Sequence, residues 1–126
     1  AIIVFAKAPV PGLAKTRLAP ALGEAGAAVL AERMLRQALA QAVAADVGPV
    51  ELCAAPDASH PALQAAAAEH GVRLTEQGTG DLGVRMHRAF ASSLMHHGRV
   101  LLIGTDAPAL DAGVLRQAAS ALQDHD

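Results

Sequence analysis

The residues with the clearest chemical potential lie in one basic stretch near the start of the chain, FAKAPVPGLAKTRL, residues 5–18. This stretch carries Lys7, Lys15 and Arg17, contains no acidic residue and follows the apolar run of residues 1–4. A loop that leads from a strand into a helix commonly holds a phosphate, and lysine and arginine suit a diphosphate. Pro11 and Gly12 shape the loop, and its prolines reduce the entropy lost on binding. We therefore predict that these five residues form a nucleotide or phosphate site; the alternative is a solvated basic turn.

The basic stretch is not a Walker A phosphate loop. Ala14-Lys15-Thr16 resembles the end of that motif, but Pro9 and Ala14 stand at its two glycine positions. Proline also removes a main-chain N–H that the phosphate cradle needs. The dinucleotide-binding pattern G-x-G-x-x-G is absent after the same apolar run.

A second candidate stretch is GTDAP, residues 104–108, which follows another apolar run. A carboxylate at the end of an inner strand can hold a divalent cation that bridges the oxygens of a nucleotide diphosphate. Asp106 is therefore predicted to bind Mg²⁺ or Mn²⁺. The alternative for Asp106 is an Asx turn or helix cap, which the spacing to Pro108 also favours.

The third candidate stretch is the glycine-rich loop of residues 78–83. Gly80 and Gly83 would let the main chain approach a base or ribose, and Asp81 could accept a hydroxyl hydrogen bond. The alternative for Asp81 is a helix N-cap. Arg85, one turn into the following helix, is predicted to point at the same site, whereas Arg88 is expected on a solvated face.

Strand-like and helix-like segments alternate along the chain. We expect strands over residues 2–6, 50–54, 72–75 and 99–103, and helices over 23–45, 59–70, from the 78–83 loop to 97, and 112–123. Ser59 is the expected cap of the second helix and Gly71 its C-terminal glycine. The third helix is expected to bury Met86, Ala89, Phe90 and Leu94.

This alternation predicts an α/β fold with three layers, in which helices cover both faces of a Rossmann-like, mostly parallel sheet. Right-handed crossovers favour the strand order 3-2-1-4 in a single domain over residues 1–126. The three candidate loops then meet at the carboxyl ends of the strands, where ligands bind in such sheets.

Composition excludes several classes of protein. The net charge of −2 argues against a nucleic-acid binder, and no apolar run predicts a membrane span. The single cysteine, Cys53, fits a reducing compartment and a place in the core, so we expect a cytoplasmic protein. Asp57 is expected to be a turn residue, and the six histidines are too scattered for a metal site. Alanine-rich helices and an open sheet edge leave room for a homodimer.

Three blocks together resemble a bacterial family of glycosyltransferases described as radical-SAM/selenodomain-associated transferases. They are FAKAPVPGLAKTRL, QGTGDLGVRMHRAF and LLIGTDAPAL, in the family's order and over most of the chain. The resemblance implies a nucleotide-diphospho-sugar transferase fold of the GT-A kind. By motif it places Lys15 and Arg17 at phosphates, Gly80, Asp81 and Gly83 near the nucleoside, and Asp106 at the metal. The family's chains continue past this point, so the resemblance implies the N-terminal, nucleotide-binding part of a longer transferase. Gly104 replaces the first carboxylate of the usual D-x-D motif.

We therefore predict a metal-dependent transferase with a nucleotide-activated donor, in the first place a glycosyltransferase that acts on a nucleotide-diphospho-sugar. The alternatives are a guanylyltransferase-like nucleotidyltransferase that uses a nucleoside triphosphate and releases pyrophosphate, and a non-catalytic nucleotide-binding module. No residue is assigned as general base.

Overall fold

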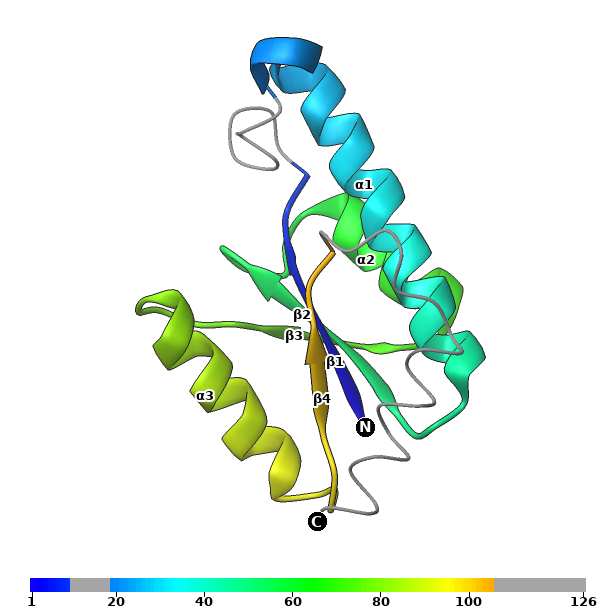
Figure 1. The fold of residues 1–126 in the computed structure, drawn as a ribbon, viewed down its shortest axis with the longest axis vertical. Coiled ribbons are helices and arrows are strands. Elements are labelled where there is room, and N and C mark those ends of the chain that lie inside the picture. The colour runs from blue at the N-terminus through cyan, green and yellow to red at the C-terminus, as the bar shows by residue number, and fades with distance from the viewer. Residues whose placement is uncertain (10–18, 106–126) are drawn as a thin grey trace.

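The computed structural model describes residues 1–9 and 19–105, which form a parallel four-stranded sheet flanked by helices (Figure 1). The strands are β1 (Ile2–Lys7), β2 (Val50–Ala55), β3 (Arg73–Glu76) and β4 (Leu101–Ile103). The helices are α1 (Ala19–Ala45), α2 (Pro61–His70) and α3 (Leu82–Leu94). The order is β3-β2-β1-β4, which confirms the predicted α/β class and sheet topology. The helix predicted over residues 112–123 lies outside the described residues.

The central strand β1 supplies both halves of the core because side chains alternate across a strand. Ile2, Val4 and Ala6 pack with α1 and α2 on one face of the sheet. Ile3 and Phe5 pack on the other face with buried residues that include Ala89 of α3. Figure 1 shows the same division, with α1 and α2 on one side of the sheet and α3 on the other.

The long helix α1 begins earlier than the sequence predicts. It starts at Ala19, and Gly23, the expected first residue, instead breaks it with φ 73° and ψ 162°. The predicted helix began at Gly23, and the non-helical conformation of this glycine separates the start of α1 from the rest of the helix. Downstream, Leu35, Leu39 and Ala42 are buried in the core on this side of the sheet.

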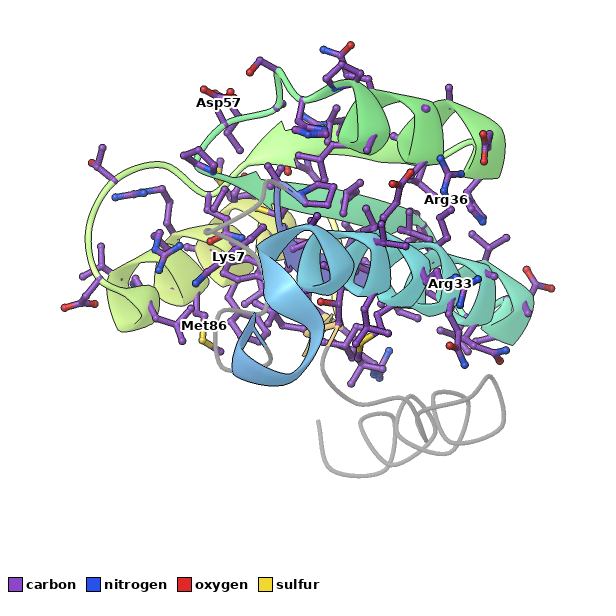
Figure 2. All side chains as sticks on the ribbon, turned by 90° about the horizontal axis from the view of Figure 1, so that it is seen from above. Lys7, Arg33, Arg36, Asp57 and Met86 are labelled. Atoms are coloured by element: carbon purple, nitrogen blue, oxygen red, sulfur yellow. The ribbon has the colours of Figure 1, made fainter. Side chains whose placement is uncertain are left out.

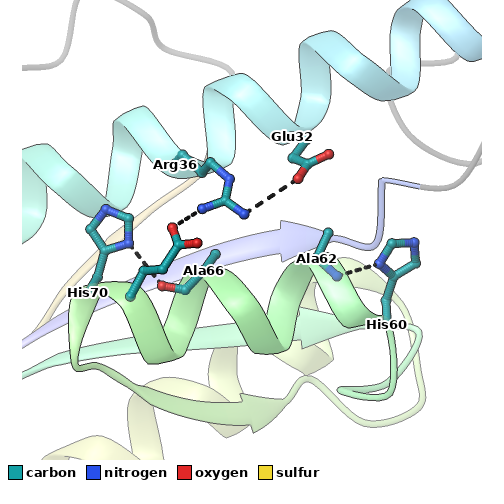
Figure 3. Close-up of polar contacts among 7 residues, drawn as sticks. Glu32, Arg36, His60, Ala62, Ala66 and His70 are labelled. Carbon is teal, nitrogen blue, oxygen red and sulfur yellow. Dashed lines mark hydrogen bonds and ion pairs between the residues drawn. The ribbon is translucent and has the colours of Figure 1, made fainter.

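The second helix has a different cap from the one expected. His60 is the N-cap of α2, and its Nδ1 accepts a hydrogen bond from the Ala62 N–H at 3.0 Å (Figure 3). Ser59 instead donates to Asp57, so the prediction of a Ser59 cap is wrong. Gly71 does close the helix in the left-handed conformation, as predicted.

An arginine of α1 links the two helices on this side of the sheet. Arg36 pairs with Glu32 one turn earlier at 3.5 Å and also with Glu69 of α2 (Figure 3). The sequence places Arg36 on the polar face of α1, and the structure adds the neighbouring helix as its partner. Among the described residues, no helix has the length and apolar character needed to cross a membrane.

The helix α3 is shorter than predicted. It ends at Leu94, and just beyond it the N–H groups of His96 and His97 both bond to the carbonyl oxygen of Ser93. Leu94 is 52% exposed, so its predicted burial is wrong. Met86, Ala89 and Phe90 do belong to the core on this face.

The edge strand β4 is also shorter than the predicted range of 99–103. Its first ladder partner, Leu101, lies opposite Ile2, where β1 itself begins. Residues 99 and 100 lie before this ladder; the carbonyl oxygen of Arg99 accepts a hydrogen bond from the amino group of Ala1 at 2.9 Å, and Val100 is buried. On the opposite edge, β3 covers Arg73–Glu76, one residue later than predicted.

Candidate functional site

The carboxyl ends of the parallel strands meet at one edge of the sheet, which we call the carboxyl edge. Figure 2 looks onto this edge. Lys7 is the last residue of β1, and its side chain is exposed there. Of the predicted basic-loop residues, only Lys7 falls within the described residues; Pro11, Gly12, Lys15 and Arg17 lie outside them. Their place beside Lys7 stays a prediction.

A buried glutamine joins three strands at the carboxyl edge. Gln77 directly follows β3 and is only 3% exposed. Its Nε2 donates to the carbonyl oxygens of Ala6 in β1 at 3.3 Å and Cys53 in β2 at 3.1 Å. Its main-chain N–H donates to the carbonyl of Ala54 at 2.9 Å. Sequence reasoning missed this residue, although it begins the glycine-rich block.

The glutamine also holds Arg85 of α3. Arg85 Nη1 donates to Gln77 Oε1 at 2.6 Å, and Arg85 Nε donates to the main-chain oxygen of Asp81 at 3.3 Å. Both acceptors are neutral, and no described carboxylate forms an ion pair with this half-buried guanidinium. Among the described residues, the positive charge of Arg85 is therefore not paired with a carboxylate, and some of its N–H groups have no acceptor at the carboxyl edge.

The glycine-rich loop enters α3 through Asp81. Asp81 is the N-cap, and its Oδ1 accepts a hydrogen bond from the Val84 N–H at 2.9 Å. The structure thus shows the capping role that the sequence left as the alternative. Gly80 has φ +106°, and its missing Cβ would lie 3.0 Å from a methyl of Val84. Gly83, in the first turn of α3, meets only an ordinary contact with Asp81 Oδ1.

A second arginine of α3 fastens the start of this loop. Arg88 Nη1 donates to the main-chain oxygen of Gln77 at 2.7 Å, although the residue is exposed. A Cβ on Gly78 would lie 2.2 Å from the same nitrogen, and Gly78 has φ +81°. The positive φ favours glycine at this position, a Cβ there would displace the guanidinium of Arg88, and the expected solvated role of Arg88 is incomplete.

Carboxylates near the edge are occupied by main-chain amides. Asp57, after β2, accepts from the Ser59 hydroxyl at 2.6 Å and the Ser59 N–H at 2.9 Å. These hydrogen bonds lower the pKa of the Asp57 carboxyl below its usual value and confirm its turn role. Glu76 accepts from the Ala58 N–H at 2.9 Å.

Within residues 1–9 and 19–105, no group of three or more His, Cys, Asp or Glu could hold a metal ion. Asp106 lies outside those ranges.

The fold is that of a solved structure described as a "putative nucleotide-diphospho-sugar transferase" from Desulfovibrio desulfuricans G20. The TM-score is 0.84 at 30% sequence identity, and the match covers 97% of this chain. The chain spans about half, 53%, of that protein's length. No curated protein matches the sequence.

The family model that matches the sequence covers residues 38–126, and thus includes both α3 and the glycine-rich loop. Its description is "Uncharacterized protein conserved in bacteria (DUF2064)". The match extends over well more than half of the chain, and by it the chain belongs to this bacterial family.

Proposed function

We propose that this chain forms the nucleotide-binding part of a transferase with a nucleotide-activated donor, and that the donor is a nucleotide-diphospho-sugar. The observation that carries the proposal is Arg85, a half-buried cation at the carboxyl edge whose described partners are all neutral oxygens. Lys7 adds a second positive charge at the end of β1. The likeness to a protein described as a nucleotide-diphospho-sugar transferase supports the same class of ligand.

In glycosyl transfer, the bond between the anomeric carbon and the β-phosphate oxygen breaks, and the nucleoside diphosphate leaves. Negative charge then builds on the leaving pyrophosphate group. Cationic side chains held in place before the reaction stabilise that charge without reorganisation. We assign this role to Lys7 and Arg85, together with Lys15 and Arg17 of the basic loop.

A divalent cation is a separate part of the proposal. The part of the chain that the structure describes holds no cluster of three or more His, Cys, Asp or Glu that could bind a metal ion. We therefore assign binding of Mg²⁺ or Mn²⁺ to Asp106, as the sequence predicts. If Mn²⁺ enhances nucleotide binding equally in wild type and Asp106→Ala by titration calorimetry, this assignment is wrong.

The reaction class is tested by the product. The full chain is incubated with nucleotide sugars and, separately, with nucleoside triphosphates, and the released phosphates are quantified. Release of nucleoside diphosphate supports the proposal. Release of pyrophosphate shows nucleotidyl transfer instead, and nucleotide binding without either product shows a binding module.

The binding residues are tested by charge removal. Lys15→Ala with Arg17→Ala should weaken nucleotide binding with little change in melting temperature, because the sequence predicts both residues in an exposed loop and exposed charges contribute little to folding. Arg33→Ala is the matched control, since Arg33 is an exposed residue of α1 that lies apart from Lys7 (Figure 2). Equal binding by the double variant and the control would contradict the assignment.

A further inference from the structure

We propose that Gln77 is a positioning residue, which fixes the guanidinium of Arg85 so that its remaining N–H groups bind the pyrophosphate group of the donor. The inference rests on the proposed function for the identity of the donor. It adds a residue that charge alone would not select, because glutamine carries no charge and Gln77 is buried.

The orientation of the Gln77 amide follows from its surroundings. Its Nε2 lies between two carbonyl oxygens, those of Ala6 and Cys53, which can only accept hydrogen bonds. The amide nitrogen must therefore face the sheet, and Oε1 must face away from it. In that orientation Oε1 is an acceptor presented to α3, where Arg85 Nη1 meets it at 2.6 Å.

Two contacts then hold the guanidinium plane. Nη1 is fixed by Gln77, and Nε is fixed by the main-chain oxygen of Asp81 at the N-cap of α3. A planar group held at two nitrogens has little freedom to turn, so its remaining N–H groups keep one direction. Less entropy is then lost when an anion binds to them.

The same glutamine links Arg85 to the start of the basic loop. Its Nε2 bonds the carbonyl of Ala6, the residue directly before Lys7. One buried side chain thus connects the strand that ends in Lys7 with the helix that carries Arg85. Phosphate is the ligand that best matches a guanidinium fork and an ammonium group at one edge.

Pyrophosphate itself is the probe, because it tests the anion site without a nucleoside. Calorimetry compares pyrophosphate and inorganic phosphate on wild type, Gln77→Met, Arg85→Lys and Arg33→Lys, with folding checked by circular dichroism. Gln77→Met and Arg85→Lys should each weaken pyrophosphate binding by about tenfold or more. They should also lower the preference for pyrophosphate over phosphate, which a general loss of stability would not change.

Arg33→Lys is the matched control, since Arg33 is an exposed residue of α1 that lies apart from Lys7 (Figure 2). Its pyrophosphate affinity should stay within about twofold of wild type. If Gln77→Met does not fold, Arg85→Lys still carries the test. The inference is overturned if the wild type does not bind pyrophosphate. It is also overturned if folded Gln77→Met, or Arg85→Lys, keeps the wild-type affinity for pyrophosphate and the wild-type preference for pyrophosphate over phosphate. If pyrophosphate binds but a nucleoside diphosphate binds no more tightly, the result supports the anion site and overturns only the proposed nucleotide function.

Discussion

Replacement of Gln77 by methionine should reveal how much the buried amide contributes to stability. Methionine has a similar length but cannot hydrogen-bond, so the carbonyls of Ala6 and Cys53 lose a donor inside the protein. Arg85 loses an acceptor but is half-buried and can be hydrated. A buried polar group left without its partner costs about 1–3 kcal/mol, so we expect a loss of about 2–4 kcal/mol in the free energy of unfolding. That loss corresponds to a fall in Tm of roughly 10 °C.

Urea unfolding followed by far-ultraviolet circular dichroism measures this loss, because the chain has no Trp or Tyr for fluorescence. The matched control is Gln64→Met, since Gln64 is exposed and its Nε2 also donates to a main-chain oxygen, that of Ala58, at 3.1 Å. The control should change stability by less than about 0.5 kcal/mol. Equal losses in the two variants would refute the reasoning, because burial of the bonds would then have no energetic consequence.

Three further predictions concern single features of the fold. Gly71→Ala should lower the free energy of unfolding, measured in urea, by about 1 kcal/mol, because Gly71 has φ +64°. Gly98→Ala should lower it less, since Gly98 has no positive φ and its Cβ position is open. Equal losses in the two variants would contradict this account. Burial raises the pKa of the Cys53 thiol, so a disulfide reagent should modify Cys53 at neutral pH only as fast as the protein unfolds; rapid labelling of the folded chain would be inconsistent with it. Ser59→Ala should raise the pKa of Asp57 in an NMR titration, because the variant removes the hydroxyl hydrogen bond that favours the carboxylate and keeps only the bond from the main-chain N–H of residue 59. Since the folded pKa lies below the unfolded one, this stabilisation is present above the unfolded pKa and lost as pH falls through the folded pKa; an unchanged titration would contradict it.

The sheet could be predicted because its signals are local. The apolar run of residues 2–6 gives β1, and each helix-like segment between strands requires a parallel crossover. Helix ends were predicted less well because they depend on competition between neighbours. Ser59 and His60 can both cap α2, and Asp57 decides the outcome by accepting the Ser59 hydroxyl.

The candidate site could be predicted only in outline. Arg85 and Asp81 could be singled out because they lie in one glycine-rich block, and their role in nucleotide binding stays a prediction. Gln77 was missed because its partners, Ala6 and Cys53, lie far away in the sequence and contribute only main-chain oxygens. A main-chain acceptor leaves no signature in residue type, so such a contact requires the folded structure.

The most direct test of a nucleotide site at the carboxyl edge is hydrogen–deuterium exchange of the full chain with and without a nucleoside diphosphate. We predict slower exchange in the segments that follow β1, β3 and β4, and unchanged exchange in α2, on the other side of the core. Binding that slows exchange in α2 but not in the segment around Gln77 and Asp81 would contradict the account.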